Sequence, residues 1–118
     1  VITNSSQGPV PGEFCGETMV VGGKADVVVK LLDGRLMPIE CKVSNSETNS
    51  YKRLIHDCGE KALSWVQNLG PANCLPAAVL SGCYSLGNLR KAQDEMGLTL
   101  IWSHDFTPLG EFLQATGR

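Results

Sequence analysis

The stretch Lys24-Ala-Asp-Val-Val-Val-Lys-Leu-Leu-Asp-Gly-Arg-Leu-Met-Pro-Ile-Glu-Cys-Lys-Val43 holds two apolar, β-branched runs on either side of an Asp-Gly pair. This pattern predicts a β-hairpin. Side chains alternate between the faces of a strand, so the odd-numbered apolar residues of both runs, Cys41 and Val43 included, should turn toward one core. A three-residue loop, Leu32-Asp33-Gly34, aligns the two sets by pairing Leu31 with Arg35, whereas a two-residue loop would send them to opposite faces.

The same pairing brings charged side chains together. It places Asp26 directly opposite Glu40, and Glu40 shares a strand face with Lys42. Two carboxylates beside a lysine can hold Mg²⁺ against a phosphodiester and prepare a water molecule for attack. Burying Glu40 in an apolar strand is costly without a cation, which favours a metal site. The alternatives are a solvated strand-end acid at Asp26 and an ion pair between Lys42 and Glu40.

Asp26, followed by Glu40-Cys41-Lys42 at the end of the next strand, resembles the PD-(D/E)xK nuclease superfamily. Lys24-Ala25 stand where the name of that motif has a proline before the aspartate. The run from Ile39 to Leu54 is similar, more narrowly, to XamI-type restriction endonucleases. The resemblance implies a restriction-endonuclease-like α/β fold, in which a mixed β-sheet is flanked by helices.

The resemblance also implies roles for the motif residues. Asp26, Glu40 and the backbone carbonyl of Cys41 would hold Mg²⁺, for which Mn²⁺ can substitute, through oxygen ligands. Lys42 would orient or deprotonate the attacking water and stabilise charge on the scissile phosphate. These residues are the expected catalytic and metal-binding set.

The family usually has a further helix before the first strand, often with a metal-binding glutamate. Residues 1–12 are rich in Ser, Gly, Pro and Asn and cannot form that helix, so either the chain lacks it or Glu13 or Glu17 substitutes. A two-residue turn at Gly22-Gly23 would place Glu17 opposite Val28 and on the face of the proposed site. The alternative for Glu17 is a solvated strand glutamate.

A polar and basic cluster follows the third expected strand and continues into the first turn of a helix: Ser44, Asn45, Asn49, Ser50, Lys52 and Arg53. Helix N-terminal amides attract phosphate. Cations at a helix N-terminus oppose the helix dipole, so an anionic partner explains Lys52 and Arg53 best. We expect these residues to contact DNA phosphate, and the alternative is an exposed polar face.

The rest of the chain predicts the element order β-β-β-α-β-α-β-α. Expected strands lie at 14–21, from 24, and at about 35–43, 76–80 and 98–103; expected helices lie near 50–69, at 85–96 and from 107. The long helix carries one apolar stripe: Leu54, Ile55, Cys58, Ala62, Trp65, Val66 and Leu69. Gly59 within this helix costs helix stability and is typical of a close packing contact.

Composition limits the function classes. The chain has 118 residues and a net charge of −2, which fits one globular domain but argues against an autonomous DNA binder. Part of the contacts with double-stranded DNA would then come from a homodimer partner or a missing N-terminal region. Five cysteines without a C-x-x-C pair indicate buried free thiols in a reducing cytoplasm, and no run suggests a membrane span.

Together these patterns predict a flexible lead at 1–12 and a nuclease catalytic domain at 13–118, as a fragment of a longer protein. The expected function is Mg²⁺-dependent hydrolysis of DNA phosphodiesters by the catalytic part of a type II restriction enzyme. One alternative is a repair or junction-resolving nuclease with the same fold. Another is a non-catalytic interaction domain that keeps the fold.

Overall fold

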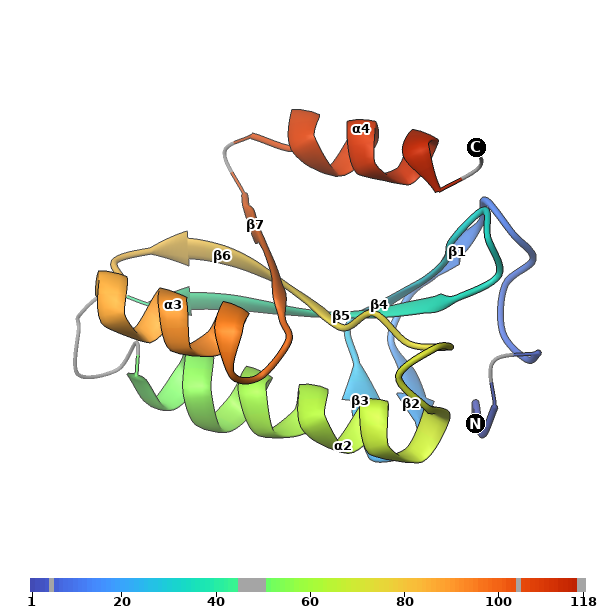
Figure 1. Ribbon diagram of the computed structural model, residues 1–118, viewed down its shortest axis with the longest axis horizontal. Helices are drawn as coiled ribbons and strands as arrows, with labels where there is room; N and C mark the ends of the chain where they lie inside the picture. The colour runs from blue at the N-terminus through green and yellow to red at the C-terminus, as the bar shows by residue number, and fades with distance from the viewer. Residues whose placement is uncertain (5, 45–50, 104, 117–118) are drawn as a thin grey trace.

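The computed structural model describes residues 1–118 except 5, 45–50, 104 and 117–118. Its main element is a five-stranded sheet in the order β1-β4-β5-β6-β7, with a separate two-stranded sheet, β2-β3 (Figure 1). The strands are β1 (Phe14–Cys15), β2 (Thr18–Val20), β3 (Gly23–Ala25), β4 (Val27–Lys30), β5 (Leu36–Ser44), β6 (Ala77–Gly82) and β7 (Thr99–Trp102). The helices are η1 (Lys52–Gly59), α2 (Glu60–Leu69), α3 (Leu86–Asp94) and α4 (Thr107–Ala115).

The hairpin of β4 and β5 has the predicted pairing. Val27 lies opposite Ile39 in the antiparallel ladder. At the loop, the Leu31 N–H donates to the Arg35 carbonyl at 2.8 Å, and the Gly34 N–H donates to the Leu31 carbonyl at 2.9 Å. Gly34 has a φ of 94°, in the left-handed region that favours glycine. The three-residue loop and its pairing of Leu31 with Arg35 are therefore confirmed.

β5 is the central strand. It pairs antiparallel with β4 and parallel with β6, which pairs parallel with β7, so the sheet is mixed. Helix α4 lies on one face of the sheet, whereas η1, α2 and α3 lie on the other (Figure 1). The first five residues of β5, Leu36–Glu40, are consequently all buried. The predicted α/β class, with a mixed sheet flanked by helices, is confirmed.

The odd-numbered face of the hairpin forms a core under α4. Its buried members Leu31, Met37 and Ile39 pack with Ala77 and Ile101, and side chains of α4 cover them. The expectation that Cys41 and Val43 would join this core is wrong, because Cys41 is exposed and Val43 is 58% exposed. Figure 1 shows the reason: α4 lies over the hairpin half of the sheet and leaves the far end of β5 uncovered.

The long helix buries its predicted stripe against the other face, except for Val66, which is half-buried. Leu54, Ile55, Cys58, Ala62, Trp65 and Leu69 are all buried there. Its first part, η1, is a π-helix where the sequence predicts an ordinary α-helix. A Cβ added at Gly59 would lie 2.1 Å from the Met96 sulfur, so the predicted close contact at this glycine is confirmed. The helix ends where predicted, with Gly70 at a φ of 96°.

The N-terminal strands differ from the prediction. The expected strand at 14–21 is split into β1 and β2, and the expected strand from Lys24 is split into β3 and β4, so the element order is also finer than predicted. Val20 pairs with Gly23, so the turn residues are Val21 and Gly22 rather than Gly22-Gly23. Val28 lies opposite Cys15, and the predicted position of Glu17 opposite Val28 is therefore wrong.

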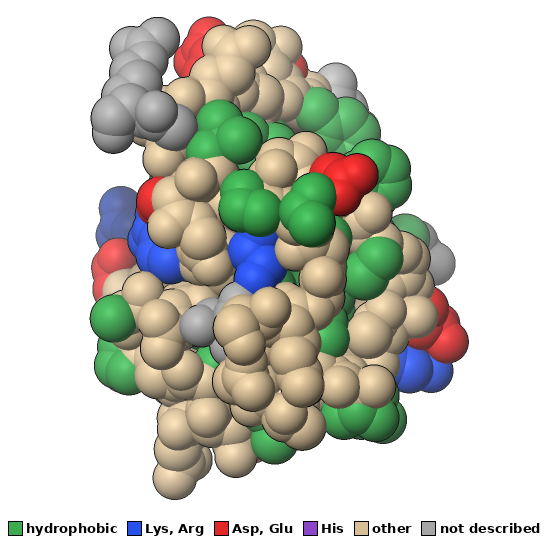
Figure 2. Space-filling model, turned by 90° about the vertical axis from the view of Figure 1, so that its right-hand side faces the viewer, with side chains coloured by type: hydrophobic (Ala, Val, Ile, Leu, Met, Phe, Trp, Pro, Cys, Tyr) green, Lys and Arg blue, Asp and Glu red, His purple; other side chains and the backbone are tan. Residues whose placement is uncertain are grey.

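The segment expected to be a flexible lead is attached to the fold at two points. Ile2 is buried, and its N–H donates to the Met19 carbonyl at 2.9 Å. Gly12 donates its N–H to the Lys30 carbonyl, also at 2.9 Å. Figure 2 shows the end of the molecule beside the β4–β5 loop, where hydrophobic side chains gather on the surface.

The cysteines are all free, as predicted. Cys58 and Cys74 are buried, but Cys41 and Cys83 are exposed, so burial was predicted wrongly for these two. Cys41 lies in the second half of β5, and Cys83 directly follows β6. Within the described part of the chain, no helix is long and apolar enough to cross a membrane.

Candidate active site

Asp26 lies between β3 and β4, where the two-stranded sheet separates from the main one. Its N–H donates to the Ile39 carbonyl at 2.9 Å, and its Oδ2 accepts the Cys41 N–H at 2.8 Å. Backbone and side chain thus both hold Asp26 against β5. Because the N–H and C=O of one strand residue point to the same side, the Cys41 carbonyl also faces this edge.

Glu40 is the neighbouring carboxylate. Its side chain is 6% exposed and forms an ion pair with Lys61 of α2. The carboxyl groups of Glu40 and Asp26 are also close enough to shift each other's pKa, so the structure brings the two predicted acids together. Burial raises the pKa of Glu40; the nearby Asp26 adds to this rise, and Lys61 opposes it.

The pKa of Asp26 moves the other way. Burial alone would raise it, but the hydrogen bonds from the Cys41 N–H and Glu40, together with the charges of Lys42 and Lys61, hold it below its usual value. The site therefore contains adjacent carboxyl groups, one with a raised and one with a lowered pKa. Pairs with opposite shifts are typical of acids that share one charged site.

Lys42 lies two residues after Glu40 on β5 and pairs with an acidic residue of η1. Its Nζ lies 4.0 Å from Oδ2 of Asp57 in η1, and the two side chains are 24% and 38% exposed. The sequence left open an ion pair between Lys42 and Glu40. The structure instead pairs Glu40 with Lys61 and Lys42 with Asp57. The Lys42 carbonyl accepts the Tyr84 hydroxyl at 3.2 Å.

An open pocket of about 440 Å³ adjoins these residues on the helix side of β5. It is lined by Gly22, Lys42, His56, Asp57, Glu60, Lys61 and Ser64. His56 Nδ1 and Glu60 Oε1 are 3.2 Å apart at its rim. The pocket thus places Lys42 of β5 and three charged residues of the long helix, Asp57, Glu60 and Lys61, beside the Asp26–Glu40 pair.

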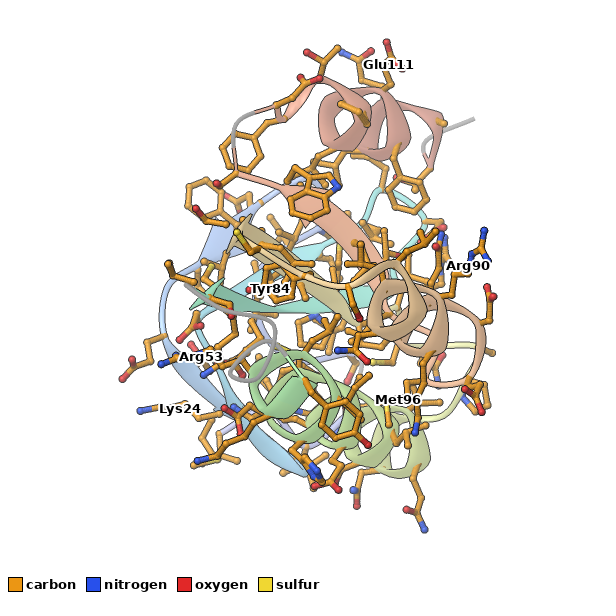
Figure 3. All side chains as sticks on the ribbon, turned by 90° about the vertical axis from the view of Figure 1, so that its left-hand side faces the viewer. Lys24, Arg53, Tyr84, Arg90, Met96 and Glu111 are labelled. Carbon is orange, nitrogen blue, oxygen red and sulfur yellow. The ribbon has the colours of Figure 1, made fainter. Side chains whose placement is uncertain are left out.

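The expected DNA-phosphate residues are only partly placed here. Asn45, Asn49 and Ser50 lie outside the described residues, and Ser44 is buried, with 1% exposed, so its side chain is not presented at the surface. Lys52 and Arg53 are exposed at the start of η1. Figure 3 looks onto this end of the molecule and labels Arg53 near Tyr84; burial raises the pKa of Tyr84, and Arg53 lowers it in part.

Glu17 is not brought to the pair of acids. Its Oε1 lies 3.3 Å from Nζ of Lys24, and both side chains are more than half exposed. Among the described residues no group of three or more His, Cys, Asp and Glu side chains is arranged to hold a metal. The structure therefore offers two carboxylates and a carbonyl, without Glu17 as a third acid.

Asp57 and Lys61 are the site residues that sequence reasoning missed. They face Lys42 and Glu40 from the long helix. The available signal was their spacing: residues four apart share a helix face, as Glu40 and Lys42 share a strand face. That signal becomes specific only when the face of the helix that meets β5 is known.

Comparison with known proteins identifies the family. Residues 2–102 match the model of the XamI restriction endonuclease family. Over 74 residues, or 63% of this chain, the sequence is 51% identical to the "Type II restriction enzyme XamI" of Xanthomonas campestris pv. amaranthicola. The matched part spans 27% of that relative's length. No solved structure matches the chain. The chain belongs to the XamI restriction endonuclease family.

Proposed function

We propose that this chain is a Mg²⁺-dependent endonuclease domain of the PD-(D/E)xK type, and that it forms the catalytic part of a type II restriction enzyme acting on double-stranded DNA. The observation that carries the proposal is the junction of β3, β4 and β5. There Asp26 bonds to Ile39 and Cys41, the two residues that flank Glu40, and Lys42 lies on the Glu40 face of the same strand. Family membership supports the same activity.

The donor set fits Mg²⁺. Asp26, Glu40 and the Cys41 carbonyl offer hard oxygen ligands, and Mg²⁺ keeps several waters, so a few protein ligands suffice. Glu40 is a buried carboxylate with a raised pKa, which is the kind of group that a divalent cation stabilises. When bound, Mg²⁺ or Mn²⁺ supplies a Lewis acid that lowers the pKa of water and offsets charge on a phosphodiester.

Lys42 is the residue we assign to the attacking water. Asp57 lies close enough to restrain its ammonium group, and the side chain lines the open pocket. A phosphodiester in this pocket would meet the Lys42 amine next to the two carboxylates. From there Lys42 would orient or deprotonate the water and stabilise the charge that develops on the phosphate.

Lys52 and Arg53 are assigned to the DNA backbone. They combine two exposed cations with the amides of a helix N-terminus, which favour anions. The net charge of −2 is low for a DNA-binding unit, so we assign the remaining contacts to a second copy or to other parts of the protein.

Metal binding tests the proposal directly. We expect the chain to bind Mn²⁺ in a calorimetric titration, and Asp26→Asn and Glu40→Gln to weaken that binding by roughly tenfold or more, since each removes a charged ligand. Glu17→Gln is the matched control and should leave the affinity unchanged. Mn²⁺ affinity that neither Asp26→Asn nor Glu40→Gln changes would overturn the metal assignment.

A cleavage assay separates the nuclease alternatives. With Mg²⁺, the protein that contains this chain should cut sequence-diverse duplex DNA, and Glu40→Ala should abolish the cutting while the fold is retained. A preference for branched over duplex DNA would instead favour a junction-resolving enzyme. A metal-binding protein that cuts neither substrate would favour the interaction domain.

A further inference from the structure

The two charged motif residues of β5 face a matching pair on the long helix. Glu40 pairs with Lys61, and Lys42 pairs with Asp57. Residues two apart on a strand are separated by about 6.6 Å. Asp57 and Lys61 are four residues apart across the junction of η1 and α2, and an α-helix would separate such residues by about 6 Å along its axis. The spacings agree, so the helix opposes each charge of the motif with its complement.

Lys61 is held in place by several contacts besides Glu40. Its Nζ donates to the Lys24 carbonyl at 3.0 Å and lies 5.9 Å from the centre of the Trp65 ring. Its stem fills the space beside Gly23, where an added Cβ would lie 2.7 Å from Cγ of Lys61. The side chain is 26% exposed, so this ammonium is not a freely moving surface charge.

The Lys61 ammonium therefore sits on the carboxylate to which the proposed function assigns the metal. The ammonium groups of Lys42 and Lys61 lie around the carboxyl groups of Asp26 and Glu40 and lower the pKa of Asp26. A divalent ion on the same Glu40 oxygen would be repelled by the ammonium group, since like charges in a partly buried site interact strongly. The Lys61 ammonium and the metal therefore compete for that oxygen.

We propose that Lys61 is a positioning residue that holds Glu40 in the metal-free protein, and that a divalent cation binds by displacing the Lys61 ammonium into the pocket beside Lys42. This inference rests on the proposed metal site at Asp26 and Glu40. It assigns to Lys61 a role that opposes metal binding and keeps the buried carboxylate ordered until the metal arrives.

Mn²⁺ titration of matched variants tests the displacement. Lys61→Met keeps most of the stem but removes the ammonium, so Mn²⁺ should bind roughly tenfold more tightly than to the wild type. Lys61→Arg keeps the charge and should retain the wild-type affinity. Lys91→Met, on α3, makes the same change in net charge and should have no effect. Equal or weaker Mn²⁺ binding by Lys61→Met would overturn the proposal.

A measurement on the wild-type protein does not depend on the folding of any variant. The ¹⁵Nζ NMR signal of Lys61 should shift and exchange faster with solvent when Mg²⁺ saturates the protein, whereas that of Lys91 should not. A Lys61 signal unmoved at saturation would overturn the displacement. If neither metal binds the wild type, the proposed function itself fails, whereas binding without any change at Lys61 removes only this inference.

Discussion

Gly82 is the position where the structure most clearly forbids a side chain. It has a φ of 103°, and an added Cβ would lie 1.9 Å from the carbonyl oxygen of Ser44. The obstacle is backbone, and the same oxygen accepts the Cys83 N–H at 2.9 Å, so it cannot move without breaking the end of β5. Gly82→Ala should cost ~1–3 kcal/mol in backbone strain and ~1–3 kcal/mol in overpacking. The sum is a large fraction of the ~5–15 kcal/mol that stabilises a typical domain.

Urea unfolding followed by circular dichroism measures this cost, and the chain contains two matched controls. Gly34 has a φ of 94° with nothing within 4 Å of its added Cβ, so Gly34→Ala should show the strain alone. Gly87 has open space and lies in α3, so Gly87→Ala should be neutral or stabilising by up to ~1 kcal/mol. The reasoning is refuted if Gly82→Ala costs no more than Gly34→Ala.

Other expected outcomes concern pH, DNA and a helix cap. Because the pKa of Glu40 is raised above its ordinary value of 4.5, the metal-free folded protein loses stability as pH rises through the folded pKa. The Glu40→Gln variant should not show this loss, and urea unfolding of both proteins at acidic and neutral pH measures the difference. If the free energy of unfolding changes with pH equally in both proteins, the prediction is wrong. The double variant Lys52→Ala/Arg53→Ala should bind DNA more weakly, by about the same factor for all sequences. In anisotropy titrations at several salt concentrations, the slope of log affinity against log salt should become shallower by up to about 2. An unchanged slope would count against these contacts. The Ser85 side chain accepts the Asn88 N–H at 3.2 Å, so Ser85→Ala should cost ~1 kcal/mol in thermal unfolding, and an unchanged melting temperature would contradict the cap.

The β4–β5 hairpin could be predicted from sequence because separate requirements agreed on one loop. The apolar faces of both strands, the glycine at a left-handed position and the closeness of Asp26 to Glu40 all need the pairing of Leu31 with Arg35. A slip by one residue would have moved every apolar side chain to the other face. Predictions with this kind of redundancy depend little on any single propensity.

The prediction of the turn between β2 and β3 lacked such redundancy. Either Val21-Gly22 or Gly22-Gly23 is an acceptable two-residue turn, and the short run before it has no long apolar alternation to decide between them. The choice is made by burial: Val20 packs into a core with Ile2 and Trp65, which are distant in sequence. The error at the turn then carried over to Glu17, whose predicted position depended on it.

The site residues on the long helix, Asp57 and Lys61, could not be predicted from the sequence for a different reason. Asp57 lies in η1, and i→i+5 bonding adds a residue to each turn, so the directions of its side chains differ from those of an α-helix. A pattern read with the ordinary 3.6-residue period locates the buried stripe but not the polar residues that border it. Lys61 follows in α2, where its direction depends on how the π segment ends. The charges that complement Glu40 and Lys42 are therefore fixed by the packing of this helix on β5, and they become recognisable only once that packing is known.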